Sequence, residues 1–339
     1  MRMVESILLA TIFISFFCTF LVLPYWIKKT KQIGLVWEDM NKPGNKKNVG
    51  GSGGLVVVFG FILGVLLYIA IKTFYFKNDG DINSYIFALV LVILLSSIVG
   101  LVDDLFGWQH GGLSRRSRIL IVLFTAIPLM VINAGESIIS LPFIGSLNLG
   151  ILYPILFIPI GILGATTTFN FLAGYNGLEA SQGIIVLSAL AYVTYVTGNS
   201  WLSVVALCMV AALFAFYIFN KYPAKIFPGD TLTYSVGALI AGMAILGNIE
   251  KIAVFFFIPY IIEFILKVIR GRYKKYSFGK PNQDGSLEMP YEKVYGLEHL
   301  AIKVLKGLKK SGKVYEYEVV YLINGFQIII ILIGLLLFL

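Results

Sequence analysis

The chain has 339 residues, of which 58% are hydrophobic and only 13% are charged, and its mean hydropathy is +0.87. This composition lies outside the range of soluble globular proteins. Because the apolar runs are continuous rather than alternating, it indicates a polytopic helical membrane protein and not an outer-membrane barrel. The formal net charge of +9 is attributed to basic cytoplasmic loops, and no nucleic-acid partner is expected.

Ten apolar segments are long enough, or nearly long enough, to cross a bilayer. The predicted fold is therefore an all-α polytopic membrane protein of about ten transmembrane helices, a single integral domain over residues 1–339. Residues 269–318 form a small α/β-like cytoplasmic subdomain between the ninth and tenth helices. The predicted spans are Val4–Ile27, Gly50–Ile71, Ser84–Val102, Ile119–Ile132, Ile151–Phe169, Gly183–Thr197, Trp201–Phe219, Thr231–Leu246, Ile252–Val268 and Val319–Leu339.

The distribution of basic residues predicts the topology. Ten spans place both termini on one side, and the loops after the odd-numbered spans then share the other side. All but four of the 27 Lys and Arg residues fall in or beside those odd loops. The positive-inside rule makes the odd loops cytoplasmic and the termini external or lumenal, in a plasma or ER-type membrane.

Polar residues interrupt this apolar pattern at a few helix ends. Asp103 and Asp104 end the third span, where two adjacent carboxylates oppose each other and the helix dipole unless a cation compensates them. Arg115, Arg116 and Arg118 follow in the same loop. The alternative is a simple ion-paired loop.

The stretch Asn170–Gln182 lies between two charge-free runs and carries two asparagines, two glycines and a glutamate. The amide of Asn170 is costly to bury without a metal, substrate or helix partner, although caps and a turn are the plainer interpretation. Asp230 stands at the entrance of the eighth span, where an N-cap is the plainer role. Glycines 50–54 offer close backbone approach and free N–H groups at the start of the second span.

The ninth loop opens with the basic run 270–275. Short strand-like pieces are expected around Tyr276–Phe278 and Leu287–Pro290. An amphipathic helix should then cap the bundle or lie on the membrane surface, with the stripe Leu297, Leu300, Ala301, Val304, Leu305 and Leu308.

The predicted topology places these polar residues from different loops on one face. Acidic and amide oxygens ringed by basic groups suit Mg²⁺, or alternatively Mn²⁺, together with a phosphorylated substrate. The only histidines are His110 and His299, so no His/Cys cluster for zinc is present. Walker A, Rossmann and Ser-His-Asp patterns are also absent from the sequence.

At this point the chain resembles the polyprenyl-phosphate N-acetylhexosamine-1-phosphate transferases over nearly its whole length. The specific pieces are residues 100–104 (Gly-Leu-Val-Asp-Asp), 170–180 and 229–231 (Gly-Asp-Thr). Residues 39–42 (Asp-Met-Asn-Lys) and 287–291 (Leu-Glu-Met-Pro-Tyr) are most similar to the branch that transfers GlcNAc-1-phosphate from UDP-GlcNAc to dolichyl phosphate.

The resemblance implies a role for each matching residue. Asn170 and Asp230 match Mg²⁺ ligands, and Asn176 matches a nucleotide-pocket residue. Asp103 and Asp104 match an aspartate pair that acts as base or organises the metal and the phosphate-binding cation. Further implied substrate-binding positions are Asp39, Met40, Asn41, Gly51, Arg118, Thr167, Lys274 and Lys275.

Several of these positions depart from the family pattern. Arg118 replaces a lysine, Thr167 an asparagine near the lipid phosphate, and Gly51 a glutamate. Lys274 and Lys275 fall near an Arg-His-Arg sugar-phosphate clamp. The histidine cluster of the bacterial branches is missing from the ninth loop.

The resemblance implies a Mg-dependent transferase acting on UDP-GlcNAc and a polyprenyl or dolichyl phosphate in the bilayer. It would release UMP in the first lipid-linked step of glycan assembly. Whether the enzyme is a homodimer stays open. One alternative is the same chemistry with another UDP-N-acetyl sugar, such as the muramyl pentapeptide donor. The other is a transporter, which the nearly charge-free spans and the lack of an internal repeat disfavour.

Overall fold

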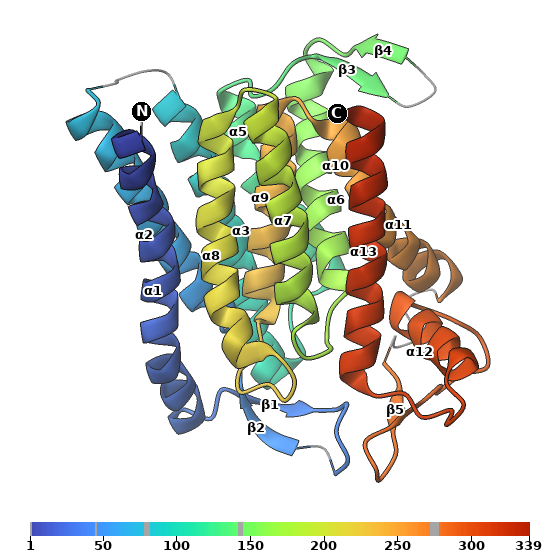
Figure 1. Cartoon of the computed structure of the whole chain (residues 1–339). Helices are drawn as coiled ribbons and strands as arrows, with labels where there is room; N and C mark the ends of the chain where they lie inside the picture. Colours follow the sequence, from blue (N-terminus) through green and yellow to red (C-terminus); the bar gives the residue numbers. More distant parts are fainter. Residues whose placement is uncertain (1, 45, 78–81, 142–144, 272–277) are drawn as a thin grey trace.

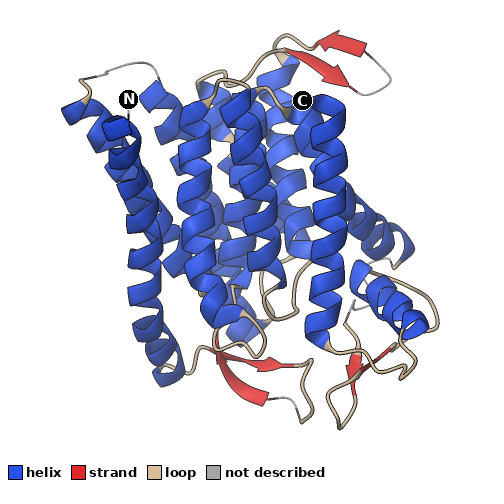
Figure 2. Cartoon of the chain, viewed as in Figure 1, coloured by secondary structure: helices blue, strands red, loops and turns tan. Residues whose placement is uncertain are grey.

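The computed structural model describes all residues except 1, 45, 78–81, 142–144 and 272–277. Helices dominate it, and three small hairpins lie at the two ends of the bundle (Figures 1 and 2). The helices are α1 (Arg2–Gln32), α2 (Gly54–Ala70), α3 (Ile82–His110), α4 (Arg115–Thr125), α5 (Ile127–Val131), α6 (Ile158–Phe171), α7 (Leu178–Val196), α8 (Ser200–Asn220), α9 (Gly229–Gly247), α10 (Glu250–Phe256), α11 (Ile258–Phe264), α12 (Leu297–Leu308) and α13 (Glu316–Phe338), with π-helical turns η1 (Ile71–Tyr75), η2 (Tyr153–Phe157) and η3 (Ile265–Arg270).

Among the described residues, eight helices are long and apolar enough to cross a membrane. A ninth candidate is the pair α10 and α11–η3, which bends by 59° at Phe257, just before Pro259. The prediction of a polytopic helical membrane protein is thus confirmed.

The predicted fourth span, Ile119–Ile132, forms two shorter helices, α4 and α5, which meet at Ala126 just before Pro128. Neither is long enough alone to be a span. The pair still runs the length of the bundle, because Arg118 pairs with Asp103 at one end. At the other end, Glu136 donates its backbone N–H to Asn248, just beyond the end of α9.

The centre of the bundle is α9, whose apolar window is 83% buried. Glycine permits this packing at specific points. A Cβ on Gly237 would lie 2.6 Å from the Cα of Thr166 on α6, and a Cβ on Gly54 would lie 2.4 Å from the backbone N of Leu232. Neighbouring helices therefore touch α9 backbone to backbone, as small residues allow in membrane proteins.

Each of the three sheets is an antiparallel pair of strands. The hairpin β1–β2 (Val36–Asp39 with Lys46–Gly50) follows α1, and β5–β6 (Lys280–Pro281 with Leu287–Glu288) lies before α12. A strand lies at 280–281; the strand-like piece expected around 276–278 falls largely outside the described residues, since 276 and 277 are not described. The third hairpin, β3–β4 (Ile138–Leu141 with Gly145–Asn148), was not predicted.

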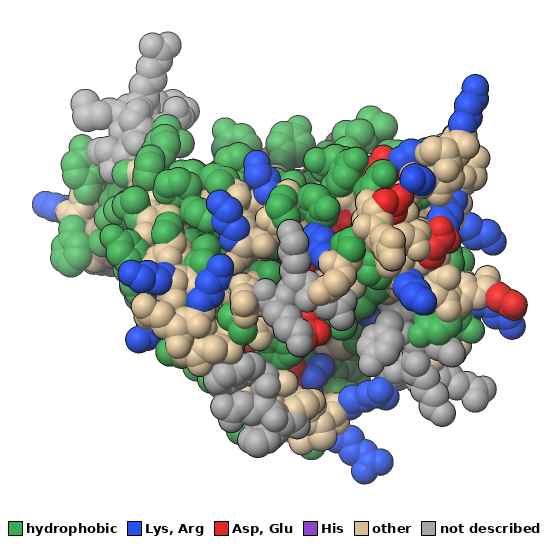
Figure 3. Space-filling view, turned by 90° about the horizontal axis from the view of Figure 1, so that it is seen from below, with side chains coloured by type: hydrophobic (Ala, Val, Ile, Leu, Met, Phe, Trp, Pro, Cys, Tyr) green, Lys and Arg blue, Asp and Glu red, His purple; other side chains and the backbone are tan. Residues whose placement is uncertain are grey.

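The two ends of the bundle differ in character. α1 begins and α13 ends at the same end, beside β3–β4, as the predicted topology requires (Figure 1). The opposite end carries β1–β2, β5–β6 and α12. Figure 3 views this end from below, and Lys and Arg side chains are spread over it with Asp and Glu among them.

The predicted amphipathic helix is α12, but only part of its apolar stripe is covered. Leu297, Ala301 and Ile302 are buried, whereas Leu300, Val304 and Leu308 are exposed by 41%, 41% and 75%. The helix therefore packs on the bundle along one edge of the stripe and leaves the other edge uncovered.

Candidate functional site

The two adjacent aspartates at the end of α3 have different partners, since successive helical residues point about 100° apart. The Asp104 carboxylate turns to α9. Its Oδ1 accepts from the backbone N–H of Asp230 at 2.7 Å, and its Oδ2 accepts from the backbone N–H and the hydroxyl of Thr231 at 3.3 and 2.7 Å. Asp104 therefore caps the start of α9 from another helix, which satisfies N–H groups that a helix start leaves free.

Two glycines of the recognised motifs make this cap possible. Gly229 has φ of 70°, and a Cβ there would lie 2.2 Å from Oδ2 of Asp104. A Cβ on Gly100, one turn before Asp104, would lie 2.4 Å from the carbonyl oxygen of Asp230. Both positions require glycine for α3 and the start of α9 to meet.

We expect Asp104→Ala to lower the stability of the protein by about 1–2 kcal/mol, because the start of α9 would lose its cap. Thermal denaturation in detergent, followed by tryptophan fluorescence, measures this. Asp104→Asn keeps one acceptor oxygen and serves as the matched variant, which should lose less. A melting temperature for Asp104→Ala equal to that of the wild type would contradict the capping role.

The Asp103 carboxylate turns instead to α4. Its Oδ2 pairs with Nη2 of Arg118 at 2.7 Å, and its Oδ1 accepts from the backbone N–H of Leu113 at 2.6 Å. The Arg118 side chain is 32% exposed, lies near Tyr234, and keeps a buried Nε without a hydrogen-bond partner. Asp103 therefore orients a guanidinium that retains the capacity to bind an acceptor.

Asp230, the second residue of α9, is not an N-cap, because Pro228 precedes the helix and Asp104 provides the cap. Its side chain lies against Asp103 and near Asp104 and Arg118. Three carboxylates thus face one guanidinium among these four residues. This crowding of carboxyl groups favours binding of a cation.

Asn170 lies near the C-terminal end of α6, at the same end of the bundle. α6 and α9 run antiparallel and touch where Thr166 meets Gly237, so Asn170 is level with the first turns of α9. Its amide nitrogen is buried and has no hydrogen-bond partner. The next residue, Phe171, accepts a hydrogen bond through its carbonyl from Lys267 at 2.7 Å.

These residues fit a hard divalent cation in donor type. Amide and carboxylate oxygens are the ligands that Mg²⁺ and Mn²⁺ prefer, and Asn170 lies level with the first turns of α9, where the Asp230 carboxyl is crowded by Asp103 and Asp104. Within the described residues, no group of three His, Cys, Asp or Glu side chains forms a metal site. A bound ion would therefore depend on the amide and on oxygens from substrate or water.

A second, fully buried polar cluster joins four loops at this end. Asn176 donates its backbone N–H to Glu316 at 2.6 Å, and its side-chain amide donates to Glu316 and Asp39 at 2.8 and 3.2 Å. Its Oδ1 accepts from the backbone N–H of Ala224 at 2.6 Å. Lys42 completes the cluster by pairing with Glu316 and, at 3.3 Å, with Asp39. The Asn176 side chain is thus held by protein groups in this structure.

The remaining predicted positions lie around these two clusters. Asn41 donates to the carbonyl of Gly174 at 2.9 Å, and Met40 beside it is 53% exposed. A Cβ on Gly51 would lie 2.7 Å from the indole nitrogen of Trp37, which explains why a larger side chain does not fit there.

Thr167 is half-buried on α6. Lys274 and Lys275 lie outside the described residues. Sequence reasoning gave no role to Glu316, Lys42 or Lys267, because the contacts Lys42–Glu316, Asn176–Glu316 and Lys267–Phe171 join residues distant in the sequence.

The ninth loop is anchored on the bundle through buried groups. Glu263 of α11 accepts from the backbone N–H of Leu297 at 2.6 Å and so caps α12. His299 is buried, with Nε2 3.2 Å from the carbonyl of Phe278, and burial lowers its pKa. His299 therefore holds the loop in place.

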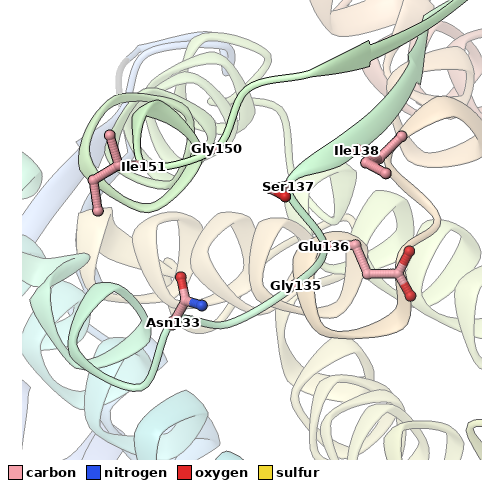
Figure 4. Close-up of a pocket in the computed structure, with 7 residues that line it drawn as sticks. All are labelled: Asn133, Gly135, Glu136, Ser137, Ile138, Gly150 and Ile151. Carbon is pink, nitrogen blue, oxygen red and sulfur yellow. The ribbon is translucent and has the colours of Figure 1, made fainter.

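A hollow lies at the other end of the bundle. It has a volume of about 460 Å³ and lies beneath β3–β4, as Figure 4 shows, where its lining side chains are drawn as sticks. Its lining residues are Asn133, Gly135, Glu136, Ser137, Ile138, Gly150 and Ile151. None belongs to the motifs above, so the candidate site is elsewhere.

The fold and these clusters define an integral membrane protein with a charged polar site at one end of its helices. Residues 86–248 match the family model described as glycosyl transferase family 4. A protein from Saccharolobus solfataricus is 37% identical over 97% of this chain and 96% of its own length. It is named, provisionally, as a UDP-N-acetylglucosamine–dolichyl-phosphate N-acetylglucosaminephosphotransferase. The chain belongs to glycosyl transferase family 4.

Two other relatives mark the breadth of this similarity. A Dictyostelium discoideum protein named as a UDP-N-acetylglucosamine–dolichyl-phosphate N-acetylglucosaminephosphotransferase is 28% identical, covering 74% of this chain and 69% of that protein. A phospho-N-acetylmuramoyl-pentapeptide-transferase from Wolbachia pipientis is 27% identical, covering 78% and 82%.

Proposed function

We propose that the protein transfers GlcNAc-1-phosphate from UDP-GlcNAc to a polyprenyl phosphate of the dolichyl type. The products are UMP and a GlcNAc-pyrophosphoryl lipid. The observation that carries this proposal is the Asp103–Arg118 pair directly beside Asp230, in a chain with a near full-length relative named for that activity.

The reaction requires one bond to form and one to break. An oxygen of the lipid phosphate attacks the β-phosphorus of UDP-GlcNAc, and the bond from that phosphorus to the oxygen bridging to the α-phosphate breaks. The electron pair leaves on the phosphate of UMP. A phosphate monoester is already largely dianionic at neutral pH, so the main obstacle is the approach of two anions.

Arg118 is the group suited to this obstacle. Its guanidinium would hold the incoming lipid phosphate through the N–H groups that Asp103 leaves free, with Asp103 fixing its orientation. Asp104 would act only indirectly, by holding the start of α9 in place, since its oxygens accept hydrogen bonds from Asp230 and Thr231.

Asn170 and Asp230 would hold a divalent cation, Mg²⁺ or Mn²⁺. When bound there, such an ion would neutralise the pyrophosphate of the donor and stabilise the leaving phosphate. The position of Asn170 level with the first turns of α9 and the crowding of the Asp230 carboxyl by Asp103 and Asp104 support this assignment.

The site would face the cytoplasm. In the sequence, all but four of the 27 Lys and Arg residues fall in or beside the loops after the odd-numbered predicted spans, and cytoplasmic loops are enriched in such residues. Described parts of those loops, β1–β2, β5–β6 and α12, lie at the end of the bundle that carries the site (Figure 1).

Arg118→Ala is expected to reduce kcat/KM for the lipid phosphate by roughly 10- to 100-fold, through loss of a charged hydrogen-bonding partner. Binding of UDP-GlcNAc without lipid, measured by calorimetry, should change little. Arg116→Ala, an exposed neighbour on the same helix turn, is the control. A large loss of nucleotide binding in Arg118→Ala would assign Arg118 to the other substrate.

The direct test of the function is label transfer. Purified protein is incubated with radiolabelled UDP-sugars, Mg²⁺ and dolichyl phosphate, and label is counted in the organic phase. Label from UDP-GlcNAc supports the proposal. Label only from the muramyl pentapeptide donor would favour the second candidate, which the similarity to the Wolbachia enzyme keeps under consideration.

A further inference from the structure

The first turn of the last helix lies in the buried cluster that joins the loops of the candidate site. Glu316, the first residue of α13, is 2% exposed and lies 140 residues from Asn176 in the sequence. Its Oε1 accepts from both the backbone and the side-chain N–H groups of Asn176, and its Oε2 pairs with Lys42. One carboxylate therefore binds both Asn176, which the family resemblance assigns to the nucleotide pocket, and the segment 39–42, in which it implies substrate-binding residues.

Each charged group of this cluster is needed to compensate the others. Lys42 is 5% exposed, lies 3.3 Å from Asp39 and is 4.2 Å above the ring of Tyr222. Two buried carboxylates thus share one ammonium group. Removal of one partner from such a set leaves an uncompensated buried charge, so the geometry of the whole set depends on each member.

The cluster fixes the spacing between two loops. Asn41 donates to the carbonyl of Gly174, and Gly174 donates its N–H to Glu179 at 2.7 Å. The turn 39–42 is therefore hydrogen-bonded to the loop 174–176, and Glu316 contacts both segments. The Oδ1 of Asn41 is buried there without a hydrogen-bond partner, an acceptor that no protein group uses.

We propose that Glu316 is a positioning residue for the nucleotide end of the nucleoside diphosphate sugar donor. It would act through Asn176 and Lys42 and would not touch the substrate. This inference rests on the proposed function. It makes the last transmembrane helix part of the donor site, although that helix contributes none of the recognised motifs.

The test uses the full-length protein with four substitutions. Glu316→Gln keeps the shape and removes the charge, and Glu316→Asp keeps the charge but shortens the reach. Glu318→Gln is the matched control, since Glu318 lies in the same turn and is also ion-paired, with Lys309 at 2.7 Å, but does not contact Asn176. Lys42→Met, alone and combined with Glu316→Gln, completes a double-mutant cycle.

We expect Glu316→Gln and Glu316→Asp to raise KM for the UDP-sugar by about 10-fold, with kcat within about threefold and KM for the lipid phosphate unchanged. Glu318→Gln should leave all three unchanged. The double variant should lose less than the product of the two single losses, because Glu316→Gln removes the buried carboxylate that Lys42→Met leaves without its ammonium partner. Unchanged donor KM in both Glu316 variants, or additive losses in the cycle, would overturn the proposal.

A purely structural role predicts a different pattern, in which the active fraction and the melting temperature fall while donor KM stays constant. The wild-type assay is performed first with a panel of UDP-sugars. Lack of transfer from UDP-GlcNAc would count against the proposed function alone. The KM ratios are then measured with the UDP-sugar that the wild type uses.

Discussion

Asp230→Asn should reduce sugar-phosphate transfer by at least about 100-fold, comparable to the loss of a group that stabilises developing charge in a transition state. The substitution removes one of the few protein charges available to a cation at the start of α9. It also leaves an amide of nearly the same size, so the lost activity reports on charge rather than on packing. Label transfer to dolichyl phosphate at limiting Mg²⁺ measures the effect.

We expect the Asp230→Asn protein to remain folded. The start of α9 is held through the backbone N–H of Asp230, which donates to Asp104, and not through the Asp230 side chain. Removing one carboxylate from beside Asp103 and Asp104 also relieves repulsion. We therefore expect a melting temperature equal to or above that of the wild type, as at other sites where function costs stability.

Asn170→Ala should also reduce sugar-phosphate transfer strongly while the protein remains folded. The Nδ2 atom of Asn170 makes no hydrogen bond to the protein. Truncation to alanine should therefore remove the proposed metal ligand without breaking a hydrogen bond of that atom. Thr168→Ala is the control on the same helix, because the Thr168 hydroxyl bonds to the α6 carbonyl of Gly164 at 2.7 Å. Mn²⁺ binding followed by electron paramagnetic resonance provides a readout independent of activity.

Two results would contradict this assignment. One is near-normal transfer by Asp230→Asn or Asn170→Ala when Mg²⁺ is limiting. The other is a wild-type enzyme that stays active after EDTA treatment. Either would show that the amide and carboxylate at these helix ends do not hold a catalytic ion.

The overall fold could be predicted because a bilayer restricts the chain to long apolar helices, which the sequence displays directly. The two short helices α4 and α5 depart from this pattern, since Pro128 lies at the start of α5 and interrupts the predicted fourth span. Most of the predicted site residues lie at the end of the bundle where α3 and α6 end and α9 begins, as the count of Lys and Arg residues in the loops implied.

The division of labour between Asp103 and Asp104 could not be predicted. The two residues are adjacent, and only the positions of α4 and α9 decide which one pairs with Arg118 and which one caps a helix. Glu316 was missed because its partners lie in distant loops and its own surroundings in the sequence resemble an ordinary helix start.

The second large effect concerns the choice of sugar. The ninth loop is closed onto the loop 174–176: a Cβ on Gly174 would lie 2.3 Å from the ring of Phe278, and Tyr175 accepts from the N–H of Gly279 at 2.9 Å. The His299 ring contacts the carbonyl of Phe278 and so helps to hold this loop in place. A donor with a lactyl-peptide arm would need space beside the sugar, which a sugar bound against these packed residues would not leave.

We therefore expect UDP-GlcNAc to be preferred over UDP-MurNAc-pentapeptide by roughly 10- to 200-fold in kcat/KM, the range that a mismatched substituent costs in a shaped pocket. Direct competition between the two donors in one reaction measures this ratio. Lys274→Ala combined with Lys275→Ala should slow GlcNAc-1-phosphate transfer without changing which lipid is accepted, as the resemblance to a basic clamp implies. Equal or better use of the muramyl donor would show that the ninth loop does not select the sugar.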